Sequence, residues 1–338
     1  MSQLLPWQRE AAASALRTRA LWPQALLLEG PRGIGKRALA LHFAQALLCE
    51  APLADGAPCG HCASCGYVDA GAHPDLRLIE PVERDEEGNE TPLEEIVVDR
   101  IRELIDFTQL STHRQRAKVA VIIPAERMNA AAANALLKTL EEPPPGTCLM
   151  LVAHQPGRLR ATLVSRCQRL VAPLPDPAEA AAWLARRGAK QPELLLAQAG
   201  GAPLLAAALA DPAVQREREI LIDELTQPQR LSPVALGARI ESYRKDERGA
   251  VLADVAYWLT TWVADLAASM SGGAPRFHPD RREALERLAG QVARIPLFRY
   301  YQMLLRQRAL LGHPLTPRLV AEAMLFEYRG LFENTHGE

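Results

Sequence analysis

Lysine is scarce in this chain of 338 residues, because only five of its 39 basic residues are lysines and the others are arginines. An excess of one charge is also lacking, since 40 acidic residues leave a formal net charge of -1. Binding to nucleic acid or to an anionic membrane through overall charge needs an excess of clustered cations. The near-equal numbers of acidic and basic residues exclude that mode of binding. The positions of the few lysines are of interest, and they are Lys36, Lys118, Lys138, Lys190 and Lys245.

Aromatic residues are few, at 5%, yet 48% of the chain is apolar. At roughly 100–200 residues per domain, the length predicts two or three domains with hydrophobic cores, which excludes disorder of the whole chain. A secretory signal is lacking, because residues 1–21 have no basic segment followed by an uninterrupted apolar run. The most apolar helical stretch, 251–270, carries Asp254 and Asp265 on one face, so we expect no membrane span and a cytoplasmic chain.

Short apolar strands alternate with helical patterns in the first half of the chain. This alternation predicts βαβ units and a parallel sheet. The acidic stretch 83–95 is expected to be a solvated loop. The expected strands are 25–29, 76–80, 118–123, 148–154 and 168–171, and the expected helices between them are 38–48, 98–110 and 130–142.

A proline-rich stretch at 172–177 marks a change in composition, and beyond it only helical patterns occur. The sequence therefore predicts an α/β domain over 1–172, a small helical domain over 173–210 and a helical bundle over 211–338. The longer helices are expected at 214–226, 234–243, 252–270, 281–294, 297–311 and 317–332.

A glycine-rich segment follows the first strand and precedes a helix, which is the setting of a phosphate-binding P-loop. Gly30, Gly33 and Gly35 would let backbone N–H groups surround phosphate oxygens, and Lys36 would neutralise their charge. The next residue should carry a hydroxyl for Mg²⁺, but it is Arg37, which cannot bind a cation. The loop is therefore only half of a catalytic one.

The strand at 119–123 should end in paired acidic residues in a working ATPase. Here it runs into Pro124, and Glu126 stands alone. We therefore expect no hydrolysis of nucleotide. A relic loop that only shapes the fold, passive binding of nucleotide and an ATPase with unusual metal ligands all stay open at this point.

Four cysteines lie close together in the sequence between residues 49 and 65. The spacings of Cys49, Cys59, Cys62 and Cys65 suit a closed tetrahedral Zn²⁺ site with a structural role. His61 is a competing ligand, which we expect to be exposed. Redox-active thiols and unrelated free cysteines are the alternatives.

Several motifs together resemble one family. They are 131–144 with its sequence Ala-Ala-Ala-Asn-Ala-Leu-Leu-Lys-Thr-Leu-Glu-Glu-Pro-Pro, the triplets 165–167 (Ser-Arg-Cys) and 73–75 (His-Pro-Asp), and the cysteine insertion after the P-loop helix. The chain resembles bacterial DNA polymerase III clamp-loader subunits. The resemblance implies an α/β AAA+-like P-loop domain with a parallel sheet and a zinc-binding insertion at about 49–75. It also implies a small helical lid and an all-α C-terminal collar for oligomerisation.

Departures from the motor subunits of that family indicate which kind of subunit this is. Arg37 and Pro124 replace catalytic features, and Leu204 lies about where the family's motors carry a γ-phosphate-sensing arginine. The resemblance thus implies a non-hydrolysing accessory subunit, part of a DNA-directed DNA polymerase without intrinsic activity. The alternatives are an active P-loop ATPase motor of a clamp loader and a zinc-dependent DNA-binding module.

The arginine of the Ser165-Arg166-Cys167 triplet acts in trans in this family. By resemblance, Arg166 would be a finger on ATP held by a neighbouring motor subunit, with Ser165 in support. A surface salt-bridge arginine is the alternative. Asn134 and Lys138 share a helix face that would meet a neighbour, line a DNA-facing interior or face solvent.

The same resemblance implies the cofactors and partners. Zn²⁺ would be structural, and ATP would be bound by neighbouring subunits, with binding by this chain itself in doubt. The partners would be the γ/τ motor subunits and the δ subunit in a hetero-pentamer, with the sliding clamp and primed DNA reached through the complex and no membrane involved.

Overall fold

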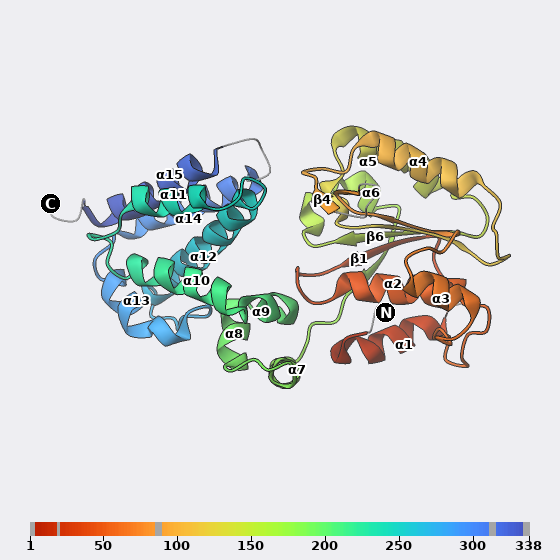
Figure 1. Ribbon diagram of the computed structural model, residues 1–338, viewed down its shortest axis with the longest axis horizontal. Helices are drawn as coiled ribbons and strands as arrows, with labels where there is room; N and C mark the ends of the chain where they lie inside the picture. The colour runs from red at the N-terminus through yellow and green to blue at the C-terminus, as the bar shows by residue number, and fades with distance from the viewer. Residues whose placement is uncertain (1–3, 19–20, 85–89, 311–315, 334–338) are drawn as a thin grey trace. The chain divides into compact units, whose positions relative to one another are not determined.

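The computed structural model describes residues 4–18, 21–84, 90–310 and 316–333 (Figure 1). The chain divides into two compact units, 1–179 and 180–338, which are described separately. Residues 1–21, for which the sequence predicts no secretory signal, lie partly outside the described residues.

The first unit is an α/β unit. Its elements are η1 (Pro6–Gln8), α1 (Arg9–Arg17), β1 (Ala25–Glu29), α2 (Lys36–Leu48), α3 (Ala63–Asp69), β2 (Leu76–Ile79), β3 (Val82–Arg84), β4 (Glu90–Pro92), α4 (Val98–Gln109), β5 (Lys118–Ile122), η3 (Ala125–Arg127), α5 (Ala130–Glu141), β6 (Thr147–Ala153), η4 (Pro156–Arg158), α6 (Ala161–Val164) and β7 (Gln168–Val171).

Five of these strands form one parallel sheet in the order β2-β5-β6-β1-β7. The central strands β1, β5 and β6 are buried along their whole length, because helices cover both faces of the sheet. The parallel sheet and its five strands confirm the predicted fold class, and each expected strand is found within one residue of its predicted ends.

Alternate residues of the central strands point to opposite faces. On one face Leu26 and Leu28 of β1 pack with Phe43 of α2. On the other face Leu27 packs among residues of α4 and α5 such as Leu104. In Figure 1, α1, α2 and α3 lie on one side of the sheet, and α4 and α5 lie on the other. The sheet is therefore the middle layer of the unit.

The acidic stretch 83–95 is not simply a loop, as the sequence had suggested. β3 and β4 pair antiparallel, with Val82 opposite Pro92, and form a separate two-stranded sheet. Residues 85–89 lie outside the described part of the chain. The hairpin was missed because its strands are short and their composition is polar, which periodicity does not detect.

The described residues of the second unit contain only helices and their connections. They are α7 (Pro177–Arg186, which begins before the division), α8 (Pro192–Gln198), α9 (Pro203–Leu209), α10 (Pro212–Leu225), α11 (Pro233–Ser242), α12 (Arg248–Ser269), η5 (Pro279–Arg281), α13 (Arg282–Ala289), α14 (Arg294–Leu310) and α15 (Pro317–Glu333). The helical prediction for this half is confirmed, although the helix expected at 281–294 ends at Ala289 and residue 311 of the next expected helix lies outside the described residues.

No single helix among the described residues is long and apolar enough to cross a membrane. Only α8 and α9 taken together, bent by 107°, reach the length and composition of a span.

Aromatic residues join three helices in the centre of the second unit. The Trp262 indole of α12 donates to the Tyr328 hydroxyl of α15 at 2.9 Å, and that hydroxyl donates to the Leu225 carbonyl at the end of α10 at 2.8 Å. All three residues are fully buried. Because buried polar groups need partners, this chain of hydrogen bonds fixes how the three helices meet.

Asp265 of α12 is buried, although it shares a helix face with Asp254, which is exposed. Its carboxylate accepts the backbone N–H groups of Arg276, Phe277 and His278 at 2.7, 2.8 and 2.7 Å. The His278 ring also contacts it at 3.0 Å. One carboxylate therefore holds the turn that leads into η5.

We predict that Asp265→Ala destabilises the second unit by about 3 kcal/mol, because the substitution leaves three N–H groups without their acceptor. Urea unfolding followed by tryptophan fluorescence would measure this loss. Glu286→Ala, which removes an exposed carboxylate from α13, is the control and should change stability by less than about 0.5 kcal/mol. Equal stabilities of the two variants would contradict the role given to Asp265.

Candidate functional sites

The glycine-rich loop connects β1 to α2 as the sequence predicted. Gly30, Gly33 and Gly35 have φ values of 152°, 82° and 93°, which L side chains rarely adopt. Lys36 is the first residue of α2 and is 2% exposed. The loop thus has the backbone form and the lysine of a phosphate-binding loop.

The Lys36 ammonium group is bound within its own loop. It donates to the Gly30 carbonyl at 2.6 Å and to the Pro31 carbonyl at 2.5 Å. Burial lowers the pKa of Lys36 to about 8, although the nearby Glu126 carboxylate raises it. A phosphate would therefore have to displace two carbonyl acceptors from this lysine.

The segment that precedes α1 packs on the same loop. The Trp7 indole donates to the Ile34 carbonyl at 3.0 Å, and the Gln8 amide donates to the same oxygen at 3.1 Å. A Cβ at Gly35 would collide with the Leu5 side chain. The loop is thereby held in one conformation from the N-terminal side.

Arg37 occupies the position at which a metal-binding hydroxyl was sought. Its guanidinium group donates to both carboxylate oxygens of Glu80, at 2.7 and 3.0 Å. Glu80 directly follows β2, so the ion pair joins the start of α2 to the end of another strand. This residue braces the loop and offers no oxygen to a cation.

The carboxylate of Glu126, which follows β5, accepts hydrogen bonds from the backbone. Its Oε1 accepts the N–H groups of His154 and Gln155 at 2.9 and 3.0 Å, at the end of β6. Burial, with Lys36 and Arg32 nearby, lowers the pKa of His154 to about 4, so its ring is neutral at pH 7. This carboxylate therefore joins the ends of two strands.

The four cysteines of the insertion lie together. Their sulfur atoms all lie within 4.8 Å of one another. Cys49 and Cys65 are buried, and Cys59 and Cys62 are partly buried. His61 is exposed, as expected, and its Nδ1 contacts the Cys59 carbonyl at 2.8 Å. The cluster can hold a metal ion with four thiolate ligands.

The separations of the sulfur atoms test whether Zn²⁺ fits. The Cys49–Cys62 and Cys59–Cys65 sulfur distances are 3.9 and 4.0 Å. Two sulfur atoms at about 2.3 Å from one tetrahedral Zn²⁺ lie about 3.8 Å apart. Both pairs have the spacing that the ion requires, and four thiolates are a usual ligand set for structural zinc.

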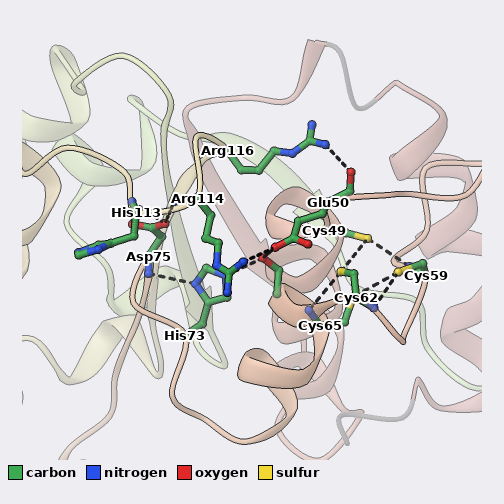
Figure 2. A network of polar contacts seen from close by, with 11 residues as sticks. Cys49, Glu50, Cys59, Cys62, Cys65, His73, Asp75, His113, Arg114 and Arg116 are labelled. Carbon is green, nitrogen blue, oxygen red and sulfur yellow. Dashed lines mark hydrogen bonds and ion pairs between the residues drawn. The ribbon is translucent and has the colours of Figure 1, made fainter.

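A polar network joins the cysteine cluster to the sheet (Figure 2). Glu50, next to Cys49, accepts the Ser64 hydroxyl and the Arg114 guanidinium, both at 3.0 Å. The Ser64 hydroxyl contacts His73 Nε2 at 3.2 Å. Sequence reasoning singled out His73 but missed Glu50, Ser64 and Arg114, because Glu50 and Arg114 lie 64 residues apart in the chain.

Asp75 completes this network at the start of β2. It is fully buried and accepts the backbone N–H groups of His113 and Arg114 at 3.0 and 3.1 Å. Lys118 at the start of β5 lies 3.5 Å from its carboxylate. The triplet at 73–75 therefore ties the cysteine insertion to the two strands β2 and β5.

Arg166 follows α6 and lies beside the end of α5. Its Nε donates to the Glu141 carboxylate at 2.6 Å, and its Nη1 donates to the Thr162 carbonyl at 2.9 Å. The Ser165 hydroxyl accepts from Nη1 at 3.4 Å and donates to the Thr162 carbonyl at 3.2 Å. The arginine is one third exposed, and these polar partners come from α5 and from residues 162–165.

Asn134 and Lys138 lie on the exposed face of α5, while Leu136 and Leu140 are buried against the sheet. The Asn134 amide oxygen accepts from Arg160 at 2.9 Å. The prediction that Asn134 and Lys138 share a helix face is confirmed.

The chain is similar to proteins of the DNA polymerase III system. Residues 11–174 match the family model described as "DNA polymerase III, delta subunit". DNA polymerase III subunit delta′ of Pseudomonas aeruginosa is 44% identical over 227 residues, which are 66% of this chain and 66% of that protein. The corresponding subunit of Escherichia coli is 38% identical over 205 residues, 60% of this chain and 58% of its own length.

A second type of relative matches a smaller part of the chain. DNA polymerase III subunit tau of Escherichia coli is 35% identical over 143 residues, 42% of this chain and 20% of that protein. The chain spans no more than about two thirds of the length of the delta′ relatives above. The resemblance expected from the motifs is confirmed, and the chain belongs to the family of DNA polymerase III delta′ subunits.

Proposed function

We propose that this chain is a non-hydrolysing accessory subunit of the DNA polymerase III clamp loader and helps the ATP-dependent loading of the sliding clamp onto primed DNA. The observation that carries this proposal is the ion pair of Arg37 with Glu80, at the position where a motor needs a hydroxyl for Mg²⁺. Lys36, bound to its own loop carbonyls, supports the same conclusion.

The chemistry of phosphoryl transfer explains why this site would not work alone. Hydrolysis needs a bound Mg²⁺ and an acidic group that orients the attacking water. Arg37 cannot ligate the ion, and Glu126 Oε1 already accepts two backbone N–H groups. Gly30, Gly33, Gly35 and Lys36 would then form a vestigial loop that shapes the fold.

We predict that the purified chain shows no magnesium-dependent ATP turnover above that of its Lys36→Ala variant. A coupled assay of ADP release would measure both proteins. Turnover by the wild-type chain that Lys36→Ala abolishes would overturn the proposal and favour the alternative, an active P-loop ATPase motor.

Arg166 is the residue through which this subunit would still assist hydrolysis. Its guanidinium is partly exposed and outside its own loop, so it is available to ATP on a neighbouring motor subunit. A planar, permanently charged fork suits charge spread over phosphoryl oxygens. Ser165 would support it through the contact with Nη1.

We predict that Arg166→Ala lowers hydrolysis at the adjacent motor site by ~10³-fold or more while the complex still assembles. Steady-state ATPase of the reconstituted complex on primed DNA, with size-exclusion chromatography, would show both effects. Arg160→Ala, which removes a nearby arginine held by Asn134, is the matched control and should leave turnover unchanged. Unchanged turnover with Arg166→Ala would contradict the finger.

We assign the cluster of Cys49, Cys59, Cys62 and Cys65 to structural Zn²⁺. When bound, the ion would link the end of α2 to α3 as a covalent clip does. The backbone N–H groups of Cys59 and Cys62 already point at neighbouring sulfur atoms, at 3.3 and 3.4 Å, which favours thiolates. A closed set of four ligands leaves no position for catalysis.

We predict about one Zn²⁺ per purified chain. Cys59→Ser should lower both the zinc content and the Tm, because metal binding contributes directly to folding. Mass spectrometry for metals and thermal unfolding would measure them. Cys167→Ala, outside the cluster, should keep its zinc, and a stable wild-type chain free of metal would defeat the assignment.

The partners are part of the same proposal. The γ/τ motor subunits and the δ subunit would form a hetero-pentamer with this chain in the bacterial cytoplasm. In this proposal the chain consists of three domains, which are the α/β domain over 1–172, a lid over 173–210 and a collar over 211–338. Leu204, which is 39% exposed on α9, would stand in the lid where motors place an arginine.

A further inference from the structure

The guanidinium group of Arg166 is held on two sides. Its Nε donates to Glu141 Oε1 at 2.6 Å, and its Nη2 also contacts that same oxygen. On the other side Nη1 donates to the Thr162 carbonyl at 2.9 Å. These contacts come from the last residue of α5 and the first turns of α6, which pack together in one core.

The identity of the shared oxygen determines which edge of the guanidinium is used. A single acceptor that meets both Nε and Nη2 lies along the side edge of the planar group. The second N–H of Nη2, on the terminal edge, points away from that oxygen. Among the described residues no other acceptor for Nη2 is found, and the side chain is 33% exposed. The Nη2 side of the terminal edge therefore remains available to an anion, while Nη1 donates to the Thr162 carbonyl and the Ser165 hydroxyl.

The place of Glu141 on its helix is unfavourable for a carboxylate. Glu141 is the last residue of α5, where the partial negative charge of the helix end disfavours another negative charge. Its contact with Arg166 offsets this cost. A solvent-exposed ion pair of this kind adds little to stability, so folding alone gives little reason for it.

We propose that Glu141 is a positioning residue for Arg166 and holds its terminal edge toward the phosphate groups of a nucleotide on a neighbouring subunit. This inference rests on the proposed role of Arg166 as a trans finger. A free arginine side chain loses rotamer entropy when it becomes fixed. Glu141 and the Thr162 carbonyl fix the side chain before the nucleotide arrives, so less of that entropy is lost in the reaction.

The test uses the reconstituted clamp loader with Glu141→Ala. We expect kcat for ATP at the adjacent site to fall by about tenfold, because a displaced catalytic group loses rate without loss of substrate binding, and KM to change less than twofold. Glu141→Gln keeps an acceptor oxygen and should recover part of the loss. Glu142→Ala removes the neighbouring, exposed carboxylate and is the matched control with unchanged kcat.

A double substitution separates positioning from a structural role. In the Arg166→Ala background, Glu141→Ala should lower kcat no further, whereas a residue that only supported the fold would lower it again. In the isolated chain, NMR of the Arg166 Nε–H should show faster hydrogen exchange with Glu141→Ala while the Tm stays within about 2 °C of wild type.

The outcomes distinguish the inference from the function on which it rests. If Arg166→Ala lowers turnover and Glu141→Ala does not, the positioning role alone is overturned. If Glu141→Ala raises turnover, Glu141 competes with phosphate, which also overturns it. If Arg166→Ala itself leaves turnover unchanged, the finger fails and the positioning role fails with it.

Discussion

The burial of a parallel sheet between two helical layers is the constraint on which the first unit depends. Parallel strands need crossover connections, so the carboxyl ends of neighbouring strands meet at one edge. β5, β6 and β1 are adjacent in the sheet, and the residues just after their carboxyl ends are therefore brought together. Lys36, Glu126 and His154 come from the segments after these three ends, and the Glu126 carboxylate raises the pKa of Lys36 while Lys36 lowers the pKa of His154. The polar atoms of Lys36 and Glu126 at this edge are bound to backbone groups.

The cysteine insertion is joined to this sheet by polar contacts. Glu50 and Ser64 each adjoin a cysteine of the cluster and are hydrogen-bonded to each other. The His73 ring contacts the Ser64 hydroxyl and accepts the backbone N–H of the buried Asp75. Because such groups are costly to bury without partners, the whole network holds together or is lost together. The position of the insertion on the sheet thus depends on a few buried hydrogen bonds.

Local pattern explains what could be predicted from the sequence. The buried run 25–29, the glycine turn before Lys36 and the two faces of α5 each depend on residues close together in the chain. Cysteine spacing likewise predicted the cluster. The ion pairs of Arg37 and Arg166 could not be predicted, because their partners are distant in the sequence. Arg37 contacts Glu80 across 43 residues, and Arg166 contacts Glu141 across 25. The burial of Asp265 was missed for a related reason, since its N–H partners lie on a turn that no helical periodicity describes.

The ion pair of Arg37 with Glu80 also bears on what a substitution at residue 37 would cost. Replacing Arg37 by a residue with a hydroxyl would leave Glu80 without this cation, while Lys36 stayed bound to carbonyls and no second acid followed β5. Under the proposed function, each such substitution would lose a contact before any turnover was gained. The contacts of Arg37 and Lys36 would then act as a barrier to catalysis by single substitutions, and selection would keep the chain in its proposed accessory role.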